Sequence, residues 1–180
     1  MTAVAIPDEL AGAIVARAAA GDELAFTRLV AAHHADMRRV AYVVCHDVDT
    51  AEDACQQAWH IAVRRLSSIR EPAKVRSWLV AIAANEARKL ARRQRRRNIL
   101  EASVRPISNT GADVTSSIDQ ADLANALSRL SPDHRMLVAL RYFADLDSTQ
   151  IAALRGRSAS GTRARLARIL DRLRKELEDA

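Results

Sequence analysis

The segment from Ser148 to Leu177 has the spacing of a short helix, a glycine turn and a longer helix rich in arginine. Ser148 is the expected N-cap of the first helix, and Gly156 permits a sharp turn at its end. Aliphatic side chains then recur at steps of three and four residues, at Leu166, Ile169, Leu170, Leu173 and Leu177. Positive side chains surround this stripe, at Arg163, Arg165, Arg168, Arg172, Arg174 and Lys175. The spacing predicts a helix-turn-helix whose second helix could enter a groove of DNA.

The composition of the rest of the chain favours helices. Aromatic residues make up only 3% of the 180 residues, and the chain has five glycines and four prolines. Because sheets are enriched in aromatic residues and their connections in glycine and proline, this composition argues against a sandwich or barrel. We expect an all-α protein with two small helical domains joined by a flexible linker. The apolar stretches are too short to cross a bilayer, and Asp8 and Glu9 stand where a secretory signal would need basic residues, so we expect no membrane insertion and a cytoplasmic protein.

The formal net charge of +6 conceals a strong segregation of charge along the chain. Residues 61–100 hold twelve basic and two acidic side chains, and residues 151–180 hold eight basic and four acidic ones. The two segments that precede these blocks are each mainly acidic. Two separate basic blocks indicate two contacts with a polyanion.

Helical periodicity and breaks divide the chain into four parts: an N-terminal extension (1–21), a first domain (22–97), a linker (98–118) and a second domain (119–180). In the first domain, residues 22–45 form a pair of helices or one bent helix, and a second helix runs from about Thr50 to Leu66. Pro72 marks a boundary, and a long helix begins near Val75 and ends in a cationic run. The second domain is a bundle of about four helices, in which Ser131 and Pro132 begin one helix as its cap and first residue.

Patterns typical of cofactor, metal or catalytic sites do not occur in the sequence. The five histidines lack metal-ligand spacing, and there is no glycine-rich phosphate loop or nucleophile with a paired base. We therefore expect no cofactor, no metal and no enzymatic activity. Cys45 and Cys55 are interpreted as buried thiols, with a redox pair as the alternative.

Three motifs in order carry a resemblance to a known family. Residues 50–59 read TAEDACQQAW, residues 76–85 read RSWLVAIAAN, and Leu140-Arg141-Tyr142-Phe143 is followed by Gln150-Ile151-Ala152. Together they resemble bacterial sigma factors of the extracytoplasmic function group, from about Asp22 onward. The resemblance implies a region 2 domain that binds core RNA polymerase and the minus ten promoter element. It also implies a region 4 domain that binds the minus thirty-five element. The alternative is a stand-alone helix-turn-helix regulator that binds duplex DNA without polymerase.

By this resemblance, the surface that binds polymerase falls on the helix that contains Glu52, Asp53, Gln56 and Gln57, whose polar groups could pair with basic residues of a partner. The alternative is an ordinary capped and solvated helix start. Members of the family are often inhibited by an anti-sigma factor, so the implied partners are core RNA polymerase, promoter DNA and an anti-sigma factor.

The same resemblance places minus ten recognition on the long helix of the first domain. Asn85 is the first candidate, because an amide both donates to and accepts from a base edge. The preceding loop, about Ser67 to Lys74, corresponds to the family's pocket for an extruded base. Cationic side chains nearby could bind phosphate, although a solvated basic face is the alternative: Arg76, Arg88, Lys89, Arg92 and Arg93. Trp78 is interpreted as a core residue.

In the second domain, the resemblance implies that the start of the last helix reads the minus thirty-five element. The candidates are Ser160, Thr162, Arg163, Arg165 and Arg168. Arginine can bind guanine through two parallel hydrogen bonds. Arg168 is instead expected on phosphate or in solvent, which is also the alternative for Arg165. The segment departs from the family motif at three places. Gln150 stands where an acidic residue is common, Arg155 and Arg157 flank Gly156 where apolar residues are usual, and Ser160-Gly161-Thr162 is displaced by one residue from the usual Gly-Thr position. These departures leave the register of the turn open.

Overall fold

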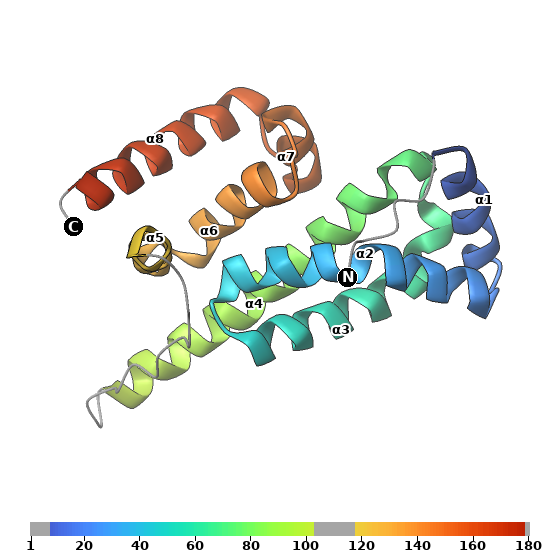
Figure 1. Ribbon diagram of the computed structural model, residues 1–180, viewed down its shortest axis with the longest axis horizontal. Coiled ribbons are helices and arrows are strands. Elements are labelled where there is room, and N and C mark those ends of the chain that lie inside the picture. The colour runs from blue at the N-terminus through green and yellow to red at the C-terminus, as the bar shows by residue number, and fades with distance from the viewer. Residues whose placement is uncertain (1–7, 103–117, 179–180) are drawn as a thin grey trace.

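A computed structural model of the chain describes residues 8–102 and 118–178, and within these residues the secondary structure is helical throughout (Figure 1). The N-terminal half contains α1 (Asp8–Ala19), α2 (Glu23–Cys45), α3 (Val48–Arg65), the 3₁₀ turns η1 (Leu66–Ser68) and η2 (Pro72–Lys74), and α4 (Val75–Ala102). The C-terminal half contains α5 (Ile118–Arg129), α6 (Pro132–Val138), a π-helical turn η3 (Ala139–Phe143), α7 (Ser148–Arg155) and α8 (Ala159–Glu178). The all-α prediction is confirmed.

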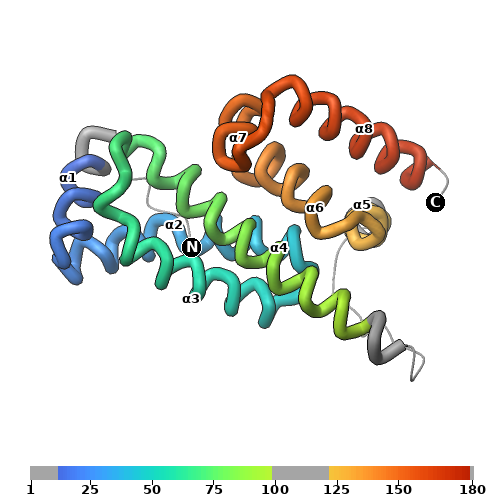
Figure 2. The backbone as a smooth tube through the Cα atoms, turned by 180° about the vertical axis from the view of Figure 1, so that it is seen from behind, coloured from blue at the N-terminus to red at the C-terminus, as the bar shows by residue number. Residues whose placement is uncertain are grey.

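The N-terminal half is a bundle in which α2, α3 and α4 pack against one another (Figures 1 and 2). Large side chains such as Met37 and Leu79 are fully buried at its centre. Alanines fill many of the remaining buried positions, which lets the helix axes approach closely: Ala54, Ala58, Ala62, Ala83, Ala84 and Ala87. This alanine-rich core explains how a chain with few aromatic residues can still pack tightly.

Side-chain caps set the helix boundaries of this bundle. The Asp22 carboxylate accepts the Ala25 backbone N–H at 2.9 Å, and the Asp47 carboxylate accepts that of Thr50 at 2.7 Å. Residues 23–45 form one continuous helix, which decides between the two arrangements expected from the sequence. It ends at His46, whose left-handed backbone (φ 57°) turns the chain directly into α3. Because Asp47 is the cap, α3 begins at Val48 rather than at Thr50.

Helix α1 was missed by the sequence analysis, which treated residues 1–21 only as an extension. Ile14 and Val15 are buried, and α1 packs on α2 and on both 3₁₀ turns. Ile14, Val15 and Ala18 have the spacing of one helical face, and this signal could have identified the helix.

The C-terminal half follows the expected helix-turn-helix closely. The Ser131 hydroxyl accepts the His134 backbone N–H at 3.3 Å, and Pro132 occupies the first turn of α6, as predicted. Gly156 forms the predicted turn, with a left-handed backbone at φ 59°. The prediction of Ser148 as the cap of α7 was wrong by one residue. Asp147 is the cap, and the Gln150 side chain accepts the Asp147 backbone N–H in return.

The two halves lie against each other, with α6 and η3 packed on α2 and α4 (Figures 1 and 2). The far end of α4 projects beyond the first bundle and continues to Ala102, five residues past the end expected at Arg97. Most of the predicted linker, residues 103–117, lies outside the described residues. No helix in the described ranges is long and apolar enough to span a membrane.

Candidate polymerase and nucleic-acid interfaces

The exposed face of α3 carries the polar groups predicted to bind polymerase. Asp53, Gln56 and Gln57 are exposed, and Glu52 is half-buried beside them. Residues at these positions fall on one side of a helix, so the structure brings all four together. The Glu52 carboxylate lies 3.6 Å from the His34 imidazole.

Trp59 lies two turns after Glu52 on α3 and anchors the edge of the polar face to α2. Its indole N–H donates to Nδ1 of His34 at 3.2 Å, and its ring packs edge-on against Phe26 with the centroids 5.5 Å apart. His34 therefore contacts both the anchor and Glu52. These contacts join α3 to α2 beside the polar face.

Asn85 lies half-buried in a shallow groove of about 470 Å³ between the ends of α3 and the middle of α4. Arg64, Arg65 and Lys89 also line this groove. The sequence analysis missed Arg64 and Arg65, although both belong to the basic block of residues 61–100. The Lys89 ammonium pairs with the Glu86 carboxylate at 2.7 Å, so the two arginines supply most of the net positive charge of the groove.

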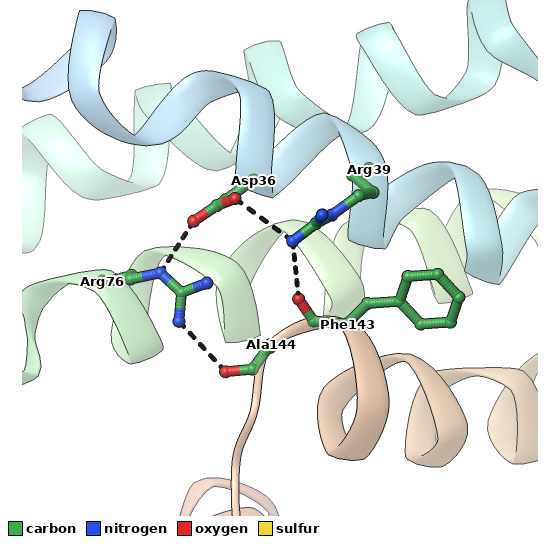
Figure 3. A network of polar contacts seen from close by, with 5 residues as sticks. All are labelled: Asp36, Arg39, Arg76, Phe143 and Ala144. Atoms are coloured by element: carbon green, nitrogen blue, oxygen red, sulfur yellow. Dashed lines mark hydrogen bonds and ion pairs between the residues drawn. The ribbon is translucent and has the colours of Figure 1, made fainter. Parts of the chain in front are cut away.

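The predicted phosphate-binding arginines on α4 fall into two groups. Arg93 is exposed on α4. Arg76 instead pairs with Asp36 at 2.7 Å and donates to the Ala144 carbonyl at 3.1 Å (Figure 3). Arg88 and Arg92 pair with Asp133 of the C-terminal half at 2.9 and 3.3 Å. Three of the five predicted cations are therefore engaged by other parts of the chain.

The loop predicted to hold an extruded base contains η1 and η2. Pro72 lies against α1 at Gly12, and α1 packs along both turns. Trp78, one turn into α4, is partly buried and packs against the hydrophobic core.

The start of α8 presents a second basic surface. Ser160, Arg163, Arg165 and Arg168 are exposed. Thr162 is 6% exposed, and its hydroxyl donates to the Ser158 carbonyl at 3.0 Å. Its hydroxyl is used within the helix, although Thr162 also lines the groove beside Arg165 and Arg168, so its contact with a base stays a prediction.

A groove of about 230 Å³ runs beside these residues, and the sequence analysis had not assigned Arg155 or Arg157 to it. Arg155 and Arg157 flank Gly156, so the helix-turn-helix geometry itself brings them next to Arg165.

The two thiols are poorly suited to nucleophilic chemistry. Burial raises the pKa of Cys45 to about 11 and that of Cys55 to about 12, and the Glu52 carboxylate also raises the latter. Both are free thiols. Since the thiolate is the reactive form, both side chains behave as small core residues at neutral pH.

Comparison with known proteins agrees with this arrangement. The family model Sigma-70 region 2 matches residues 29–97, and the model Sigma-70, region 4 matches residues 120–173. The ECF RNA polymerase sigma factor SigM of Mycobacterium tuberculosis is 31% identical over 166 residues, which cover 87% of this chain and 83% of SigM. The chain belongs to the ECF sigma factors of the sigma-70 family.

Two further relatives extend the comparison. The probable RNA polymerase sigma factor RfaY of Xanthomonas campestris is 32% identical over 168 residues, and the match spans 89% of this ECF sigma factor but only 42% of RfaY. The solved structure of the sigma factor RpoE of Bartonella quintana, in complex with the anti-sigma factor NepR, has a TM-score of 0.63 and 25% identity. That match covers 79% of this chain and 89% of RpoE.

The ECF sigma factor therefore directs promoter-specific transcription initiation by core RNA polymerase, and it is not an enzyme. The alternative of a stand-alone regulator is not favoured, because a region 2 model matches most of the first bundle as well. The α3 face and the Asn85 groove lie within the region 2 match, and the exposed start of α8 lies within the region 4 match.

Proposed function

We propose that this ECF sigma factor docks on core RNA polymerase through the exposed face of α3, holds the minus ten element in the Asn85 groove and reads the minus thirty-five element with α8. The proposal rests on one observation: the molecule has three separate surfaces whose side chains differ in chemistry. A face of carboxylates and amides lies on α3, and two arginine-lined grooves lie one in each half of the chain.

The α3 face suits a basic protein partner. Asp53 and its neighbours Gln56 and Gln57 offer one full negative charge and two amides on exposed surface, with Glu52 at the edge. Such a surface steers a positively charged partner and fixes its register, while exposed charges contribute little to the stability of the sigma factor itself.

The Asn85 groove suits a single-stranded segment of the opened promoter. It is open to solvent and combines an amide with the Arg64 and Arg65 guanidinium groups. Extruding a base costs a few kcal/mol, and nearby phosphate contacts offset part of this cost. Asn85 then selects the base, whereas the arginines hold the backbone without reading sequence.

The start of α8 suits the major groove of the duplex. Arg163 and Arg165 can each form two parallel hydrogen bonds with guanine, and Ser160 can contact either a base or a phosphate. Arg168, one turn further along, contacts phosphate. Arg155 and Arg157 in the turn add further phosphate contacts beside them.

We also propose regulation by an anti-sigma factor, by analogy with the complex of RpoE and NepR. Because the sigma factor works with RNA polymerase on chromosomal promoters, the proposal places it in the cytoplasm.

The decisive experiment is transcription in vitro with core RNA polymerase from the source bacterium and a pool of its genomic fragments. The wild-type chain should select defined start sites that core polymerase alone does not use. The Asp53→Arg variant should weaken assembly with core polymerase by about tenfold through charge reversal on the docking face. Glu178→Arg makes the same charge change on an exposed residue at the end of α8, outside the three proposed surfaces, and should assemble normally. Absence of start-site selection by the wild-type chain would refute the proposed function.

A further inference from the structure

The Asn85 groove is lined by side chains of three chemical kinds. Ile61 of α3 and Ile82 of α4 are apolar and half-buried. The cations of the groove are exposed, namely Arg64, Arg65 and Lys89. An unpaired base needs apolar surface for the faces of its ring and cations for its phosphates, and the groove offers both.

Glu86 is the one buried residue among the side chains that line this groove. It is 6% exposed, and its Oε1 atom accepts a hydrogen bond from the Lys89 ammonium at 2.7 Å. Within residues 8–102 and 118–178, the other oxygen, Oε2, accepts no hydrogen bond. Because both oxygens of a carboxylate are acceptors, Oε2 remains available to a ligand in the groove.

Neither phosphate binding nor helix stability explains a buried carboxylate at this place. A carboxylate repels phosphate, so Glu86 lowers the attraction of the groove for a nucleic-acid backbone. Its pair with Lys89 stabilises a helix only slightly. Such a pair also forms on open surface, as Glu71 and Lys74 show, likewise three residues apart and at 2.7 Å. The burial of Glu86 beside Asn85 therefore indicates a contact with a base.

Glu86 and Asn85 differ in the bases that they can distinguish. An amide both donates and accepts, so Asn85 can pair with any unpaired base, whereas a carboxylate only accepts. Adenine, cytosine and guanine each carry an exocyclic amino group, which offers N–H donors to a carboxylate. Thymine instead has a carbonyl oxygen on each side of its single ring N–H, and these oxygens repel a carboxylate. Glu86 therefore favours a base that carries an amino group.

We propose that Glu86 determines specificity at one position of the minus ten element. Its carboxylate accepts a hydrogen bond from the exocyclic amino group of adenine, cytosine or guanine and disfavours thymine. The inference rests on the proposed function, because that function places the minus ten element in this groove. It adds to Asn85 a second residue that contacts a base, with a direction of preference that an amide does not give.

The test is transcription in vitro by the complete holoenzyme from a promoter found with the genomic fragment pool, with each minus ten position randomised in turn. Sequencing of the transcribed templates gives the ratio of amino-bearing bases to thymine at each position. The principal variant is Glu86→Gln, because glutamine keeps the size of the side chain while its amide can also donate to a thymine oxygen. At one position the wild-type ratio should favour amino-bearing bases about tenfold, and Glu86→Gln should bring it close to one.

Glu176→Gln is the matched control. The Glu176 carboxylate accepts from Arg172 of its own helix at 2.8 Å, its side chain is only 18% exposed, and it lies outside the three proposed surfaces. The substitution changes the net charge equally and should leave the ratio at the wild-type value. Glu86→Ala is the second variant, which also removes the acceptor and should abolish the preference. Far-ultraviolet circular dichroism checks that each variant keeps its helices, and Glu86→Ala decides if Glu86→Gln does not fold.

The inference is overturned if the wild-type holoenzyme shows no such preference at any position. It is equally overturned if the Glu86 variants lower transcription from all templates alike and keep the wild-type ratios, since that result describes a structural role. For a variant too weak to transcribe, competition between single-stranded minus ten oligonucleotides for the holoenzyme gives the same ratio. Failure of the proposed function is a different result, namely the absence of start-site selection by the wild-type chain on any template.

Discussion

Asn85 combines an amide with partial burial in a groove whose other polar groups are mainly cationic. In the proposed function, replacing Asn85 with alanine removes its hydrogen bonds to a base but no phosphate contact. We predict that Asn85→Ala reduces promoter opening by roughly tenfold to a hundredfold, since one base-specific contact is worth about 1–3 kcal/mol. Permanganate footprinting of the opened strand measures this effect.

Assembly of Asn85→Ala with core polymerase should be unchanged, because the α3 face is intact. The exposed Asn125 on α5 offers a matched substitution, Asn125→Ala, that should leave opening at the wild-type level. Equal promoter opening by Asn85→Ala and Asn125→Ala would mean that Asn85 does not take part in recognising the minus ten element.

His46 makes the stability of the fold depend on pH. Burial, and to a lesser extent the nearby Arg135 charge, lower its pKa from 6.5 to about 4. Between these values the unfolded chain binds a proton that the folded chain does not. The free energy of unfolding therefore falls as the pH drops from 6.5 toward 4, by up to about 1.4 kcal/mol per pH unit.

We predict that His46→Asn makes this fall shallower, because the titrating group is gone. Asparagine tolerates the left-handed backbone at this position, so the cap of α2 is retained. Urea unfolding at pH 7.0 and 5.0 gives the change for each variant, with His60→Asn as an exposed control. His33 and His134 also have lowered pKa values, so only the difference between variants is informative. Identical slopes for wild type and His46→Asn would contradict the assignment.

Single residues also mark the limit of what the sequence can predict. Asn85, Arg163 and Arg165 were identified from motifs and lie on accessible surface. The burial of Thr162 was not foreseen, because motif matching does not reveal which side of α8 faces the core. Arg64 and Arg65 were missed because their groove forms only when α3 packs on α4, and no local pattern records that contact.

At the scale of elements, the caps decide where helices begin. Asp147 accepts the backbone N–H groups of both Thr149 and Gln150, at 2.7 and 2.8 Å. We predict that Asp147→Ala lowers the free energy of unfolding by about 1 kcal/mol, whereas Ser148→Ala changes it by much less. Denaturant unfolding of the two variants measures the difference. A larger loss of unfolding free energy for Ser148→Ala would mean that Ser148, rather than Asp147, caps α7.

Periodicity predicted helices α2 to α4 and the bundle of the second half, because their apolar positions repeat at three and four residues. A helix boundary differed from its prediction where a carboxylate, rather than the neighbouring hydroxyl, capped the helix, as with Asp147 and Ser148 at the start of α7. Helix α1 escaped notice because its apolar face is short and includes several alanines. The local sequence pattern therefore predicts which segments are helical, whereas the exact helix boundaries depend on which side chain caps the helix.

At the scale of the whole molecule, the contact between the halves was invisible to the sequence analysis, which joined the domains only by a linker. Arg135 is 8% exposed in the C-terminal half and donates to the Val44 carbonyl at the end of α2, at 2.6 Å. It also donates to Ser128 within its own half at 3.1 Å. These hydrogen bonds form only when α6 packs on α2, so the spacing of residues in the sequence does not predict them.

This contact predicts coupled unfolding. Both tryptophans, Trp59 and Trp78, lie in the N-terminal half, so their fluorescence reports that half alone, whereas circular dichroism reports the helices of both. In the wild-type chain the two signals should change together in urea. Arg135→Ala leaves two carbonyls without their charged donor, which costs about 1–3 kcal/mol. The circular dichroism transition should then begin at lower urea than the fluorescence transition. Coincident transitions in Arg135→Ala would mean that Arg135 does not couple the halves.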